Sequence, residues 1–383
     1  IIDGHSILNR AFYGLPDLTN YEGLHTNAVL GFLNIIFKII DEENPTNVCV
    51  AFDVKQPTFR HLVYKEYKGT RKPMPDELRE QVPLIKEMLS AMGINIMSLE
   101  GYEADDLLGT VARRSEAKGM DVTILSGDRD LLQLATDNIL VRIPKTKAGG
   151  TTIENYYADD VKDLYGVTPV QFIDMKGLMG DTSDNIPGVP GIGEKTASKI
   201  IQQWGSVAGA LEHIDEIKPP KAQKNLAEFS EQAIMSRELA AIKLDCELDF
   251  KLEDTTYENA FNDNSYNIFK RLEFKSLLKK FDNQQTVSEL KPDITVVNST
   301  ADFAYIEAAK KSGAVGVYVA HSNDMMLGIA VACDSKDVYV INCSSGIDPD
   351  EAVKFIYDLK NAGIIICMED LKSALKYVDF HEC

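Results

Sequence analysis

The chain has 383 residues, 59 acidic and 40 basic, which gives a formal net charge of −19. With 44% hydrophobic and 26% charged residues, its composition excludes a disordered, collagen-like or disulfide-stapled protein. No apolar run approaches the roughly 18 residues that a membrane span needs. The six cysteines are scattered without a CxxC pair, which is typical of free thiols in a reducing cytosol. We therefore expect a cytoplasmic protein without membrane association.

The length predicts two or three domains, each able to bury its own core. The sequence opens inside a strand-like run at Ile1 without a Met, and it stops at Cys383 with no closing element. We therefore expect a fragment of a longer chain.

Strand-like runs alternate with amphipathic helical stretches over residues 1–168, with strands expected at 47–52 and 121–125 and helices at 28–40 and 78–92. This alternation predicts an α/β domain with a parallel sheet flanked by helices. Residues 169–281 are mostly helical in pattern, which predicts a helical subdomain.

Residues 282–292 are polar and lack periodicity, which predicts an interdomain linker. A second α/β unit, which we expect to be incomplete, follows over 293–383. Its strands are expected at 294–297, 315–319, 327–332, 338–341 and 364–367, and its helices at 301–311, 350–361 and 371–377.

Nine carboxylates lie at the ends of expected elements. Strand-like runs lead into Asp3, into Asp53 and into the Asp128–Asp130 turn, and the carboxyl ends of parallel strands meet at one edge of a sheet. Each residue alone could be an ordinary helix cap or turn residue. Together they would repel one another unless divalent cations lay among them, and an all-oxygen set favours Mg²⁺ or Mn²⁺. This predicts two-metal displacement at phosphorus. The nine are Asp3, Asp53, Glu103, Asp105, Asp106, Asp128, Asp130, Asp181 and Asp184.

A basic segment, residues 55–72, carries six cations against the single acid Glu66, a local net charge of +5 in an acidic chain. Aromatic residues alternate with the cations, which suits single-stranded nucleic acid because phosphates bind charge and bases stack on rings. A solvated helical face with ordinary lysines is the alternative. The predicted DNA contacts from this segment are Phe59, Arg60, Lys65, Tyr67 and Lys72, and the segment also contains Lys68 and Arg71.

A Gly/Pro-rich turn at 187–193 directly precedes a helical run. Its free amides and the following helix N-terminus would form an anion site for a backbone phosphate. This spacing is typical of a helix-hairpin-helix motif, which holds duplex DNA without reading its bases. The predicted contacts are Gly188, Val189, Gly191, Gly193, Lys195 and Thr196.

These motifs resemble, in order over residues 1–281, the 5′-3′ exonuclease domain of the bacterial DNA polymerase I family, a branch of the flap endonuclease family. The motifs that carry the resemblance are 3–6, 51–53, 67–71, 103–106, 126–134 and 180–193. The resemblance implies a parallel-sheet, PIN-like fold with a helical arch and a helix-hairpin-helix subdomain. It also implies hydrolysis of phosphodiesters near a 5′ end or flap junction, leaving a 5′-phosphate.

The resemblance further assigns roles to residues. Tyr67 would stack on a displaced base, and Lys68 and Arg71 would contact the scissile phosphate from the arch. Asp106 and Asp184 would support the ligands, and the hairpin carbonyls could bind K⁺. The first Mg²⁺ would be held by Asp3, Asp53, Glu103 and Asp105, and the second by Asp128, Asp130 and Asp181, with Mn²⁺ able to substitute.

As partners, the resemblance implies DNA with a 5′ flap, a nick or a 5′ end, including an RNA primer. We expect a monomer, with a polymerase domain in cis in the full-length parent.

Residues 293–383 resemble the 3′-5′ exonuclease domain of the same polymerase family, with a ribonuclease H-like fold. The family's Asp-x-Glu strand motif here reads Val317-Tyr318-Val319-Ala320, and the second motif's aspartate is missing near Asp370. Without these carboxylates a two-metal site cannot assemble. We therefore predict an inactive, structural domain.

Two other functions are compatible with parts of the pattern. A non-catalytic DNA-binding scaffold would need the carboxylates to bind no metal, which a calorimetric Mn²⁺ titration tests. A metal-dependent phosphohydrolase of small phosphate esters would need neither the basic segment nor the hairpin, and activity on a generic aryl phosphate tests it.

Overall fold

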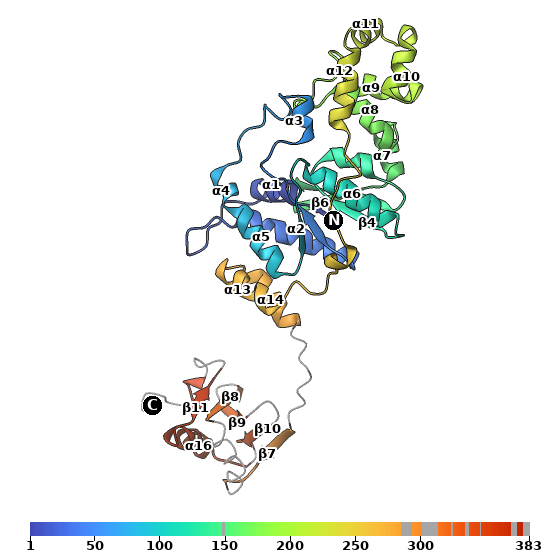
Figure 1. Ribbon diagram of the computed structural model, residues 1–383. Helices are drawn as coiled ribbons and strands as arrows, with labels where there is room; N and C mark the ends of the chain where they lie inside the picture. Colours follow the sequence, from blue (N-terminus) through green and yellow to red (C-terminus); the bar gives the residue numbers. More distant parts are fainter. Residues whose placement is uncertain are drawn as a thin grey trace. The chain divides into compact units, whose positions relative to one another are not determined.

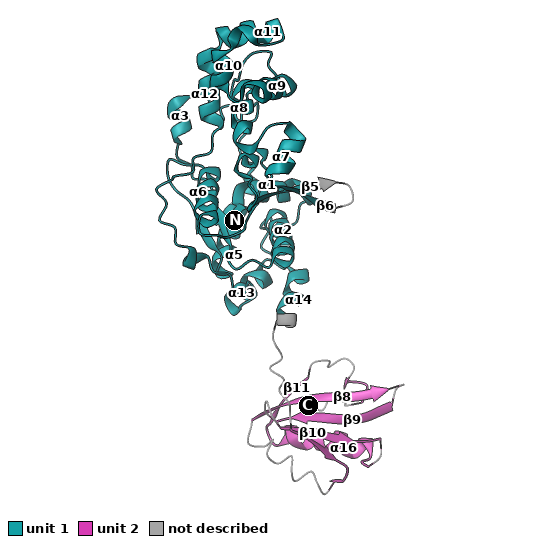
Figure 2. Ribbon diagram, turned by 90° about the vertical axis from the view of Figure 1, so that its right-hand side faces the viewer, with its two compact units in different colours: residues 1–284 teal, residues 285–383 magenta. Residues whose placement is uncertain are grey.

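The computed structural model describes residues 1–147, 150–284, 293–300, 313–322, 325–333, 337–344, 346–368 and 374–377. The chain divides into two compact units, Ile1–Gln284 and Gln285–Cys383, which Figure 2 shows in different colours. Most of the predicted linker, the helix expected at 301–311 and residues 371–373 of the one expected at 371–377 lie outside the described residues.

A six-stranded sheet of order β3-β2-β1-β4-β5-β6 forms the centre of unit 1. The first five strands in this order are parallel, and β6 pairs antiparallel with β5. The predicted parallel sheet is therefore confirmed, with an antiparallel strand added at one edge. The strands are β1 (Ile2–Asp3), β2 (Cys49–Ala51), β3 (Asn95–Met97), β4 (Val122–Leu125), β5 (Ile139–Lys147) and β6 (Gly150–Tyr156).

Both faces of this sheet are covered by helices. Successive residues of a strand point to opposite faces, so Val50 and Phe52 belong to one hydrophobic cluster while Cys49 and Ala51 belong to another. The first cluster includes side chains of α1, α2 and α5, and the second those of α6. The helices of this part are α1 (Gly4–Gly14), α2 (Asn27–Glu43), α3 (Phe59–Val63), α4 (Asp76–Arg79), α5 (Gln81–Ala91), α6 (Ala104–Glu116) and the 3-10 helix η1 (Arg129–Leu134).

The predicted helical region extends from one end of the α/β part (Figure 1). Helix α8 packs on α9 and α12, and the cluster that fills this region continues into the α6 side of the sheet. The two parts thus share a continuous core. The helices are α7 (Ala158–Tyr165), α8 (Pro169–Met179), α9 (Glu194–Trp204), α10 (Val207–Glu212), η2 (Ile214–Glu216), α11 (Pro220–Glu228) and α12 (Ser230–Ala240).

The last helices of unit 1 return to the α/β part. After η3 (Leu252–Thr255), helices α13 (Asp263–Arg271) and α14 (Lys275–Gln284) lie at the opposite end of the unit from α9–α12 (Figure 1). Phe261 and Phe269 pack against Phe37 of α2, and their ring centroids lie 4.9 and 6.5 Å from that of Phe37, respectively. Residues from about 256 to 284 therefore stabilise the α2 face of the sheet and do not extend the helical region.

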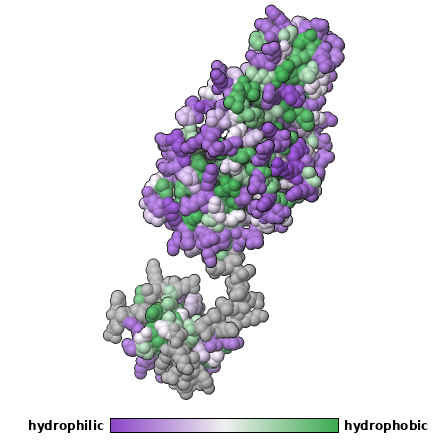
Figure 3. Space-filling model, in the orientation of Figure 1, coloured by the Kyte–Doolittle hydropathy of each residue, from purple (hydrophilic) through white to green (hydrophobic). Residues whose placement is uncertain are grey.

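Hydrophilic residues predominate on the face of unit 1 seen in Figure 3, with hydrophobic patches scattered among them. In the part of the chain that the structure describes, no helix is long and apolar enough to cross a membrane.

Unit 2 has a five-stranded mixed sheet of order β11-β8-β9-β10-β7, with its core on the side of α16 (Pro349–Asn361). All five strand predictions are confirmed, while the ribonuclease H-like assignment stays a prediction. The strands are β7 (Asp293–Val297), β8 (Ala314–Ser322), β9 (Met325–Ala332), β10 (Asp337–Asn342) and β11 (Ile365–Cys367).

Candidate active site

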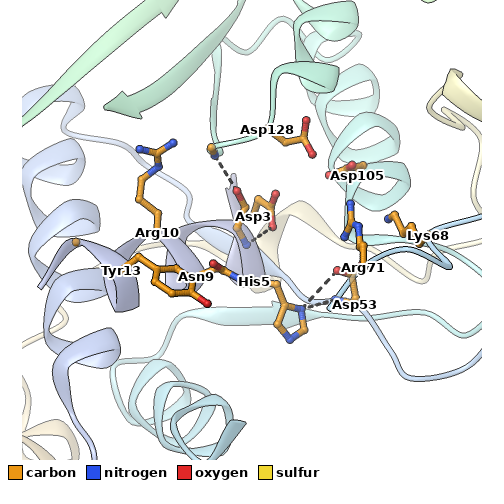
Figure 4. A pocket seen from close by; sticks show the side chains of 13 residues that line it. Asp3, His5, Asn9, Arg10, Tyr13, Asp53, Lys68, Arg71, Asp105 and Asp128 are labelled. Carbon is orange, nitrogen blue, oxygen red and sulfur yellow. Dashed lines mark hydrogen bonds and ion pairs between the residues drawn. The ribbon is translucent and has the colours of Figure 1, made fainter. Parts of the chain in front are cut away.

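A cavity of about 440 Å³ opens at the carboxyl ends of the central strands of unit 1 (Figure 4). Four of the predicted carboxylates line it, and so do the two cations predicted to act in catalysis. The fold therefore brings together predicted residues as far apart in the sequence as Asp3 and Asp128. The lining residues are Asp3, His5, Ser6, Asn9, Arg10, Tyr13, Gly14, Asp53, Lys68, Arg71, Asp105, Gly127 and Asp128.

Local hydrogen bonds hold the carboxylates in place. Asp3 ends β1 and caps α1, accepting hydrogen bonds from the Ser6 amide (3.0 Å) and the Ser126 hydroxyl (2.7 Å). Asp53 follows β2 and accepts a bond of 2.7 Å from the Ala104 amide at the N-terminus of α6. Helix N-termini attract negative charge, so these contacts stabilise the ionised carboxylates.

The same carboxylates also repel one another. Burial raises the pKa of Asp3 to about 6, and the neighbouring charges of Asp53 and Asp128 add to this effect. Burial, followed by Asp3 and Asp128, raises the pKa of Asp105 well above its ordinary value. Burial alone would raise the pKa of Asp53, but the bonds with His5 and the Ala104 amide outweigh it and lower that pKa to about 2. The pocket therefore concentrates negative charge that a cation would neutralise.

The donor set fits a hard divalent ion, because it offers carboxylate oxygens around an open cavity. Among the residues that the structure describes, however, no three His, Cys, Asp or Glu side chains are close enough together to hold one ion between them. Mg²⁺ commonly keeps several waters and takes only one or two protein carboxylates, with substrate phosphates completing its shell. The spacing is therefore compatible with Mg²⁺ bound partly through water.

The basic segment reaches this cavity through Lys68 and Arg71. Lys68 has a left-handed backbone with φ of +56°, and its amide donates to the Asp184 carbonyl (2.8 Å). Its Nζ lies 2.8 Å from Glu103 Oε1, and Arg71 pairs with Asp184. Burial alone would lower the pKa of Lys68, but Glu103 and Asp184 raise it, so the side chain is charged. Glu103 and Asp184 therefore orient the two cations and do not themselves line the cavity.

The structure corrects the predicted roles of Arg60 and Tyr67. Both are buried, with 2% and 3% of their surface exposed, so Tyr67 cannot stack on a displaced base in this arrangement. Its hydroxyl donates to Glu103 and Asp184, at 3.0 Å each. Arg60 pairs with Asp106, whose side chain is fully buried, as the supporting role predicted for Asp106 requires.

The other predicted contacts of the basic segment differ in exposure. Lys65 and Lys72 are exposed and can reach a ligand, whereas Phe59 is half-buried, with the Arg60 guanidinium 4.5 Å from its ring centroid. The predicted arch is helical only in α3 and α4, and residues 64–75 between them form turns and coil.

Asp130 and Asp181, predicted to share a metal with Asp128, are instead joined by a lysine. Lys176 Nζ lies 2.6 Å from Asp130 Oδ1 and also pairs with Asp181. Burial, followed by the charge of Asp128, raises the pKa of Asp130 to about 7 despite Lys176. Burial alone would raise the pKa of Asp181, but Lys176 and Ser183 lower it to about 2.

The hairpin lies in the turn between α8 and α9, as predicted, but part of it faces inward. The Gly188 amide donates to the Ser236 hydroxyl (3.0 Å) and the Val189 amide to the Leu178 carbonyl (2.7 Å), so neither is free for a phosphate. This corrects the two predicted contacts. Gly188 has φ of +57°, and a Cβ there would lie 2.3 Å from the Gly180 nitrogen.

The outer part of the hairpin remains available. Gly191, Gly193 and Lys195 are exposed, and Thr196 is half-buried. The carbonyls of Gly188 and Pro190 already accept bonds from the side-chain amides of Gln232 (2.7 Å) and Asn225 (2.6 Å), which K⁺ would have to displace.

The sequence analysis did not identify several residues of this region. His5, Asn9, Arg10 and Tyr13 line the cavity from α1. Their spacing after Asp3 was the available signal, because positions 2, 6, 7 and 10 after the cap lie on one face of a helix. Lys176 was also missed, although it lies only five residues before Asp181.

The chain belongs to the 5′-3′ exonuclease family. Residues 1–166 match its N-terminal resolvase-like domain and residues 167–263 its C-terminal SAM fold, together well over half of the chain. The predicted family and the predicted fold of unit 1 are thus confirmed.

Among its relatives, DNA polymerase I of Bacillus subtilis (strain 168) is 40% identical over 99% of this chain, and that of Bacillus caldotenax is 43% identical over 96%. The chain spans 44% and 43% of the lengths of these two relatives.

Solved structures support the same fold. The T5 D15 protein co-crystallised with metal ions is 22% identical, with a TM-score of 0.50, and the match covers 74% of this chain and 96% of that one. T5 5′-exonuclease with bound zinc is 23% identical over the same shares, also with a TM-score of 0.50.

In unit 2, β8 carries Val317, Tyr318, Val319 and Ala320, and no residue of this strand is acidic. Val317 and Val319 are buried, while Tyr318 is exposed. The strand therefore offers apolar side chains to the core and no carboxylate ligand. The second motif near Asp370 lies outside the described residues, and the inactivity of this unit stays a prediction.

Proposed function

We propose that this chain hydrolyses phosphodiester bonds near the 5′ end of nicked or flapped DNA, with Mg²⁺ as its metal and Mn²⁺ able to substitute. The observation that carries this proposal is one cavity lined by Asp3, Asp53, Asp105 and Asp128 together with Lys68 and Arg71. Family membership and T5 structures with bound metal ions support it.

Each part of the cavity has a role in this reaction. Bound divalent ions supply Lewis-acid chemistry at phosphorus, and the carboxylates would hold them. Lys68 and Arg71 line the cavity from the basic segment. They would bind the negative oxygens of the scissile phosphate and stabilise the charge that develops during attack by water. The attacking water loses a proton and forms the new P–O bond, the bond from phosphorus to the 3′ oxygen breaks, and that oxygen takes up a proton and leaves as a 3′-hydroxyl. The downstream product keeps the 5′-phosphate.

The surroundings of the cavity favour a polymeric substrate. Lys65 and Lys72 extend the positive charge of the basic segment, and the hairpin presents Gly191, Gly193 and Lys195. A small phosphate ester would use neither surface. Phosphate contacts of this kind position DNA without reading its sequence, so we propose that the substrate is recognised by its structure.

The relatives named DNA polymerase I are more than twice as long as this chain. We propose that the nuclease acts beside a polymerase domain in cis, as a monomer in the cytoplasm, on DNA or RNA 5′ ends.

A calorimetric Mn²⁺ titration of the wild type and of Asp3→Ala tests the metal site. Tight binding that Asp3→Ala weakens supports the nuclease, whereas no binding by the wild type contradicts it and favours a scaffold. Hydrolysis of a generic aryl phosphate at rates similar to DNA cleavage would favour a phosphohydrolase instead.

A further inference from the structure

Lys176 lies between two carboxylates that were predicted to hold a metal ion. It is the eighth residue of α8, 8% of its surface is exposed, and its Nζ pairs with Asp130 of η1 (2.6 Å) and with Asp181 of the turn after α8. A lysine is rarely buried unless it is paired. Its ammonium therefore acts as a fixed positive charge between Asp130 and Asp181, which form a second group of carboxylates beside the Asp3 cavity.

The surroundings of the two carboxylate groups differ. Asp3 accepts its hydrogen bonds from the Ser6 amide and the Ser126 hydroxyl, which are both neutral. The cations Lys68 and Arg71 pair with Glu103 and Asp184, neither of which lines the cavity. At Asp130 and Asp181, Lys176 supplies a hydrogen-bonded cation to each. An incoming ion would gain less at the second group than at the first, because part of the negative charge there is already neutralised.

The Lys176 ammonium and a second divalent ion would also compete for the same oxygens. Lys176 Nζ bonds Asp130 Oδ1 and Asp181 Oδ2, and a divalent ion bridging the two carboxylates would need these atoms. The ammonium would have to move away, and its burial leaves few other partners.

We propose that Lys176 is a positioning residue that holds Asp130 and Asp181 together before a second ion binds and competes with that ion for them. The first ion then binds at the Asp3 cavity more tightly than the second binds beside Asp130. This inference rests on the proposed function, because it assumes that the cavity binds divalent ions.

Calorimetric Mn²⁺ titration without DNA tests the competition. Lys176→Met removes the charge with little change in volume, and we expect it to bind the second ion at least about 10-fold more tightly than the wild type, because a cation that occupies the ligand oxygens is removed. Lys176→Arg keeps the charge and should resemble the wild type. Lys118→Met, an exposed lysine beyond the end of α6, is the matched control and should leave the isotherm unchanged.

A double variant tests whether the ion that binds more tightly to Lys176→Met is held by Asp130. Adding Asp130→Asn to Lys176→Met should remove the gain if the second ion binds Asp130. A gain that persists in this double variant contradicts the inference, and so does an isotherm of Lys176→Met that equals that of the wild type.

Thermal unfolding supplies a readout that does not depend on activity. Without divalent ions, Lys176→Met leaves two half-buried carboxylates without their cation and should unfold at a lower temperature, and Mn²⁺ should raise this temperature more than in the wild type. If Lys176→Met does not fold, Lys176→Gln gives the same comparison. A wild type that binds no Mn²⁺ contradicts the proposed function as well, whereas one tight ion unaffected by either variant contradicts this inference alone.

Discussion

Arg60 and Asp106 form a two-pronged ion pair inside unit 1, with Nη1–Oδ2 and Nη2–Oδ1 distances of 2.8 Å each. The Arg60 side chain is 3% exposed and that of Asp106 is fully buried. The pair joins α3, at the start of the basic segment, to α6, which carries Asp105. The pair therefore fixes the position of the basic segment, which contains Lys68, relative to α6, which contains Asp105.

Loss of this pair should destabilise the protein strongly. Arg60→Ala leaves the Asp106 charge buried and unpaired, and we expect the free energy of unfolding to fall by about 3–5 kcal/mol. Arg79→Ala removes an exposed arginine that pairs with Asp76 and should cost less than about 1 kcal/mol. Urea denaturation of both variants measures the difference, and equal losses would contradict the structural role of Arg60.

Lys68 should act on the chemical step. Lys68→Met removes a cation from the cavity wall, and we expect the single-turnover cleavage rate at saturating enzyme to fall by about 10²- to 10³-fold, because the charge on phosphorus grows in the transition state. Lys65→Met, an exposed lysine of the same segment, should weaken DNA binding without this loss of rate. An unchanged rate in Lys68→Met would refute the role.

Stability without divalent ions should depend on pH in a defined direction. The pKa values of Asp3 and Asp130 are raised to about 6 and about 7 by burial, so between about pH 4 and pH 7 the folded protein holds protons that the unfolded chain has lost. The free energy of unfolding therefore falls as pH rises through this window.

Urea denaturation at pH 5 and pH 7.5 in EDTA measures this fall. Asp3→Asn should make it smaller, and Mg²⁺ should do the same because a bound cation stabilises the ionised carboxylates. The lowered pKa values of Asp53 and Asp181, at about 2, act only below pH 4 and stabilise the protein above it. Stability that rises from pH 5 to pH 7.5 without metal would contradict this account of the cavity.

The hairpin should bind duplex phosphate through its exposed part. Lys195→Ala should weaken binding to duplex DNA of any sequence and reduce the slope of log affinity against log salt by about 1. Lys118→Ala, outside the hairpin, should leave both unchanged. Fluorescence anisotropy at several salt concentrations distinguishes them, and an unaltered slope for Lys195→Ala would exclude this contact.

The sequence predicted the cavity well where its residues follow strands. Asp3, Asp53 and Asp128 come just after parallel strands, whose carboxyl ends meet at one edge whatever the details of packing. Within the Glu103–Asp106 run, only Asp105 lines the cavity. Neighbouring positions on a helix point roughly 100° apart, so Asp106 turns into the core and Glu103 caps the helix.

The sequence predicted burial poorly in the basic segment. Alternating cations and aromatic rings describe an exposed nucleic-acid surface and a buried ion-pair network equally well. The partners that bury Arg60 are Asp106 and the carbonyls of Leu239 and Ala241, which are 46, 179 and 181 residues away along the chain. Such long-range pairing sets the role of Tyr67 as well, and no local pattern indicates it.

Cleavage of a labelled double-flap DNA with Mg²⁺, beside an EDTA control and the Asp128→Ala variant, tests the central claim most directly. We predict metal-dependent release of the 5′ flap by the wild type, with a 5′-phosphate on the downstream strand, and no cleavage by Asp128→Ala although it still binds the DNA. Binding without cleavage by the wild type, or cleavage that survives Asp128→Ala, would contradict the account.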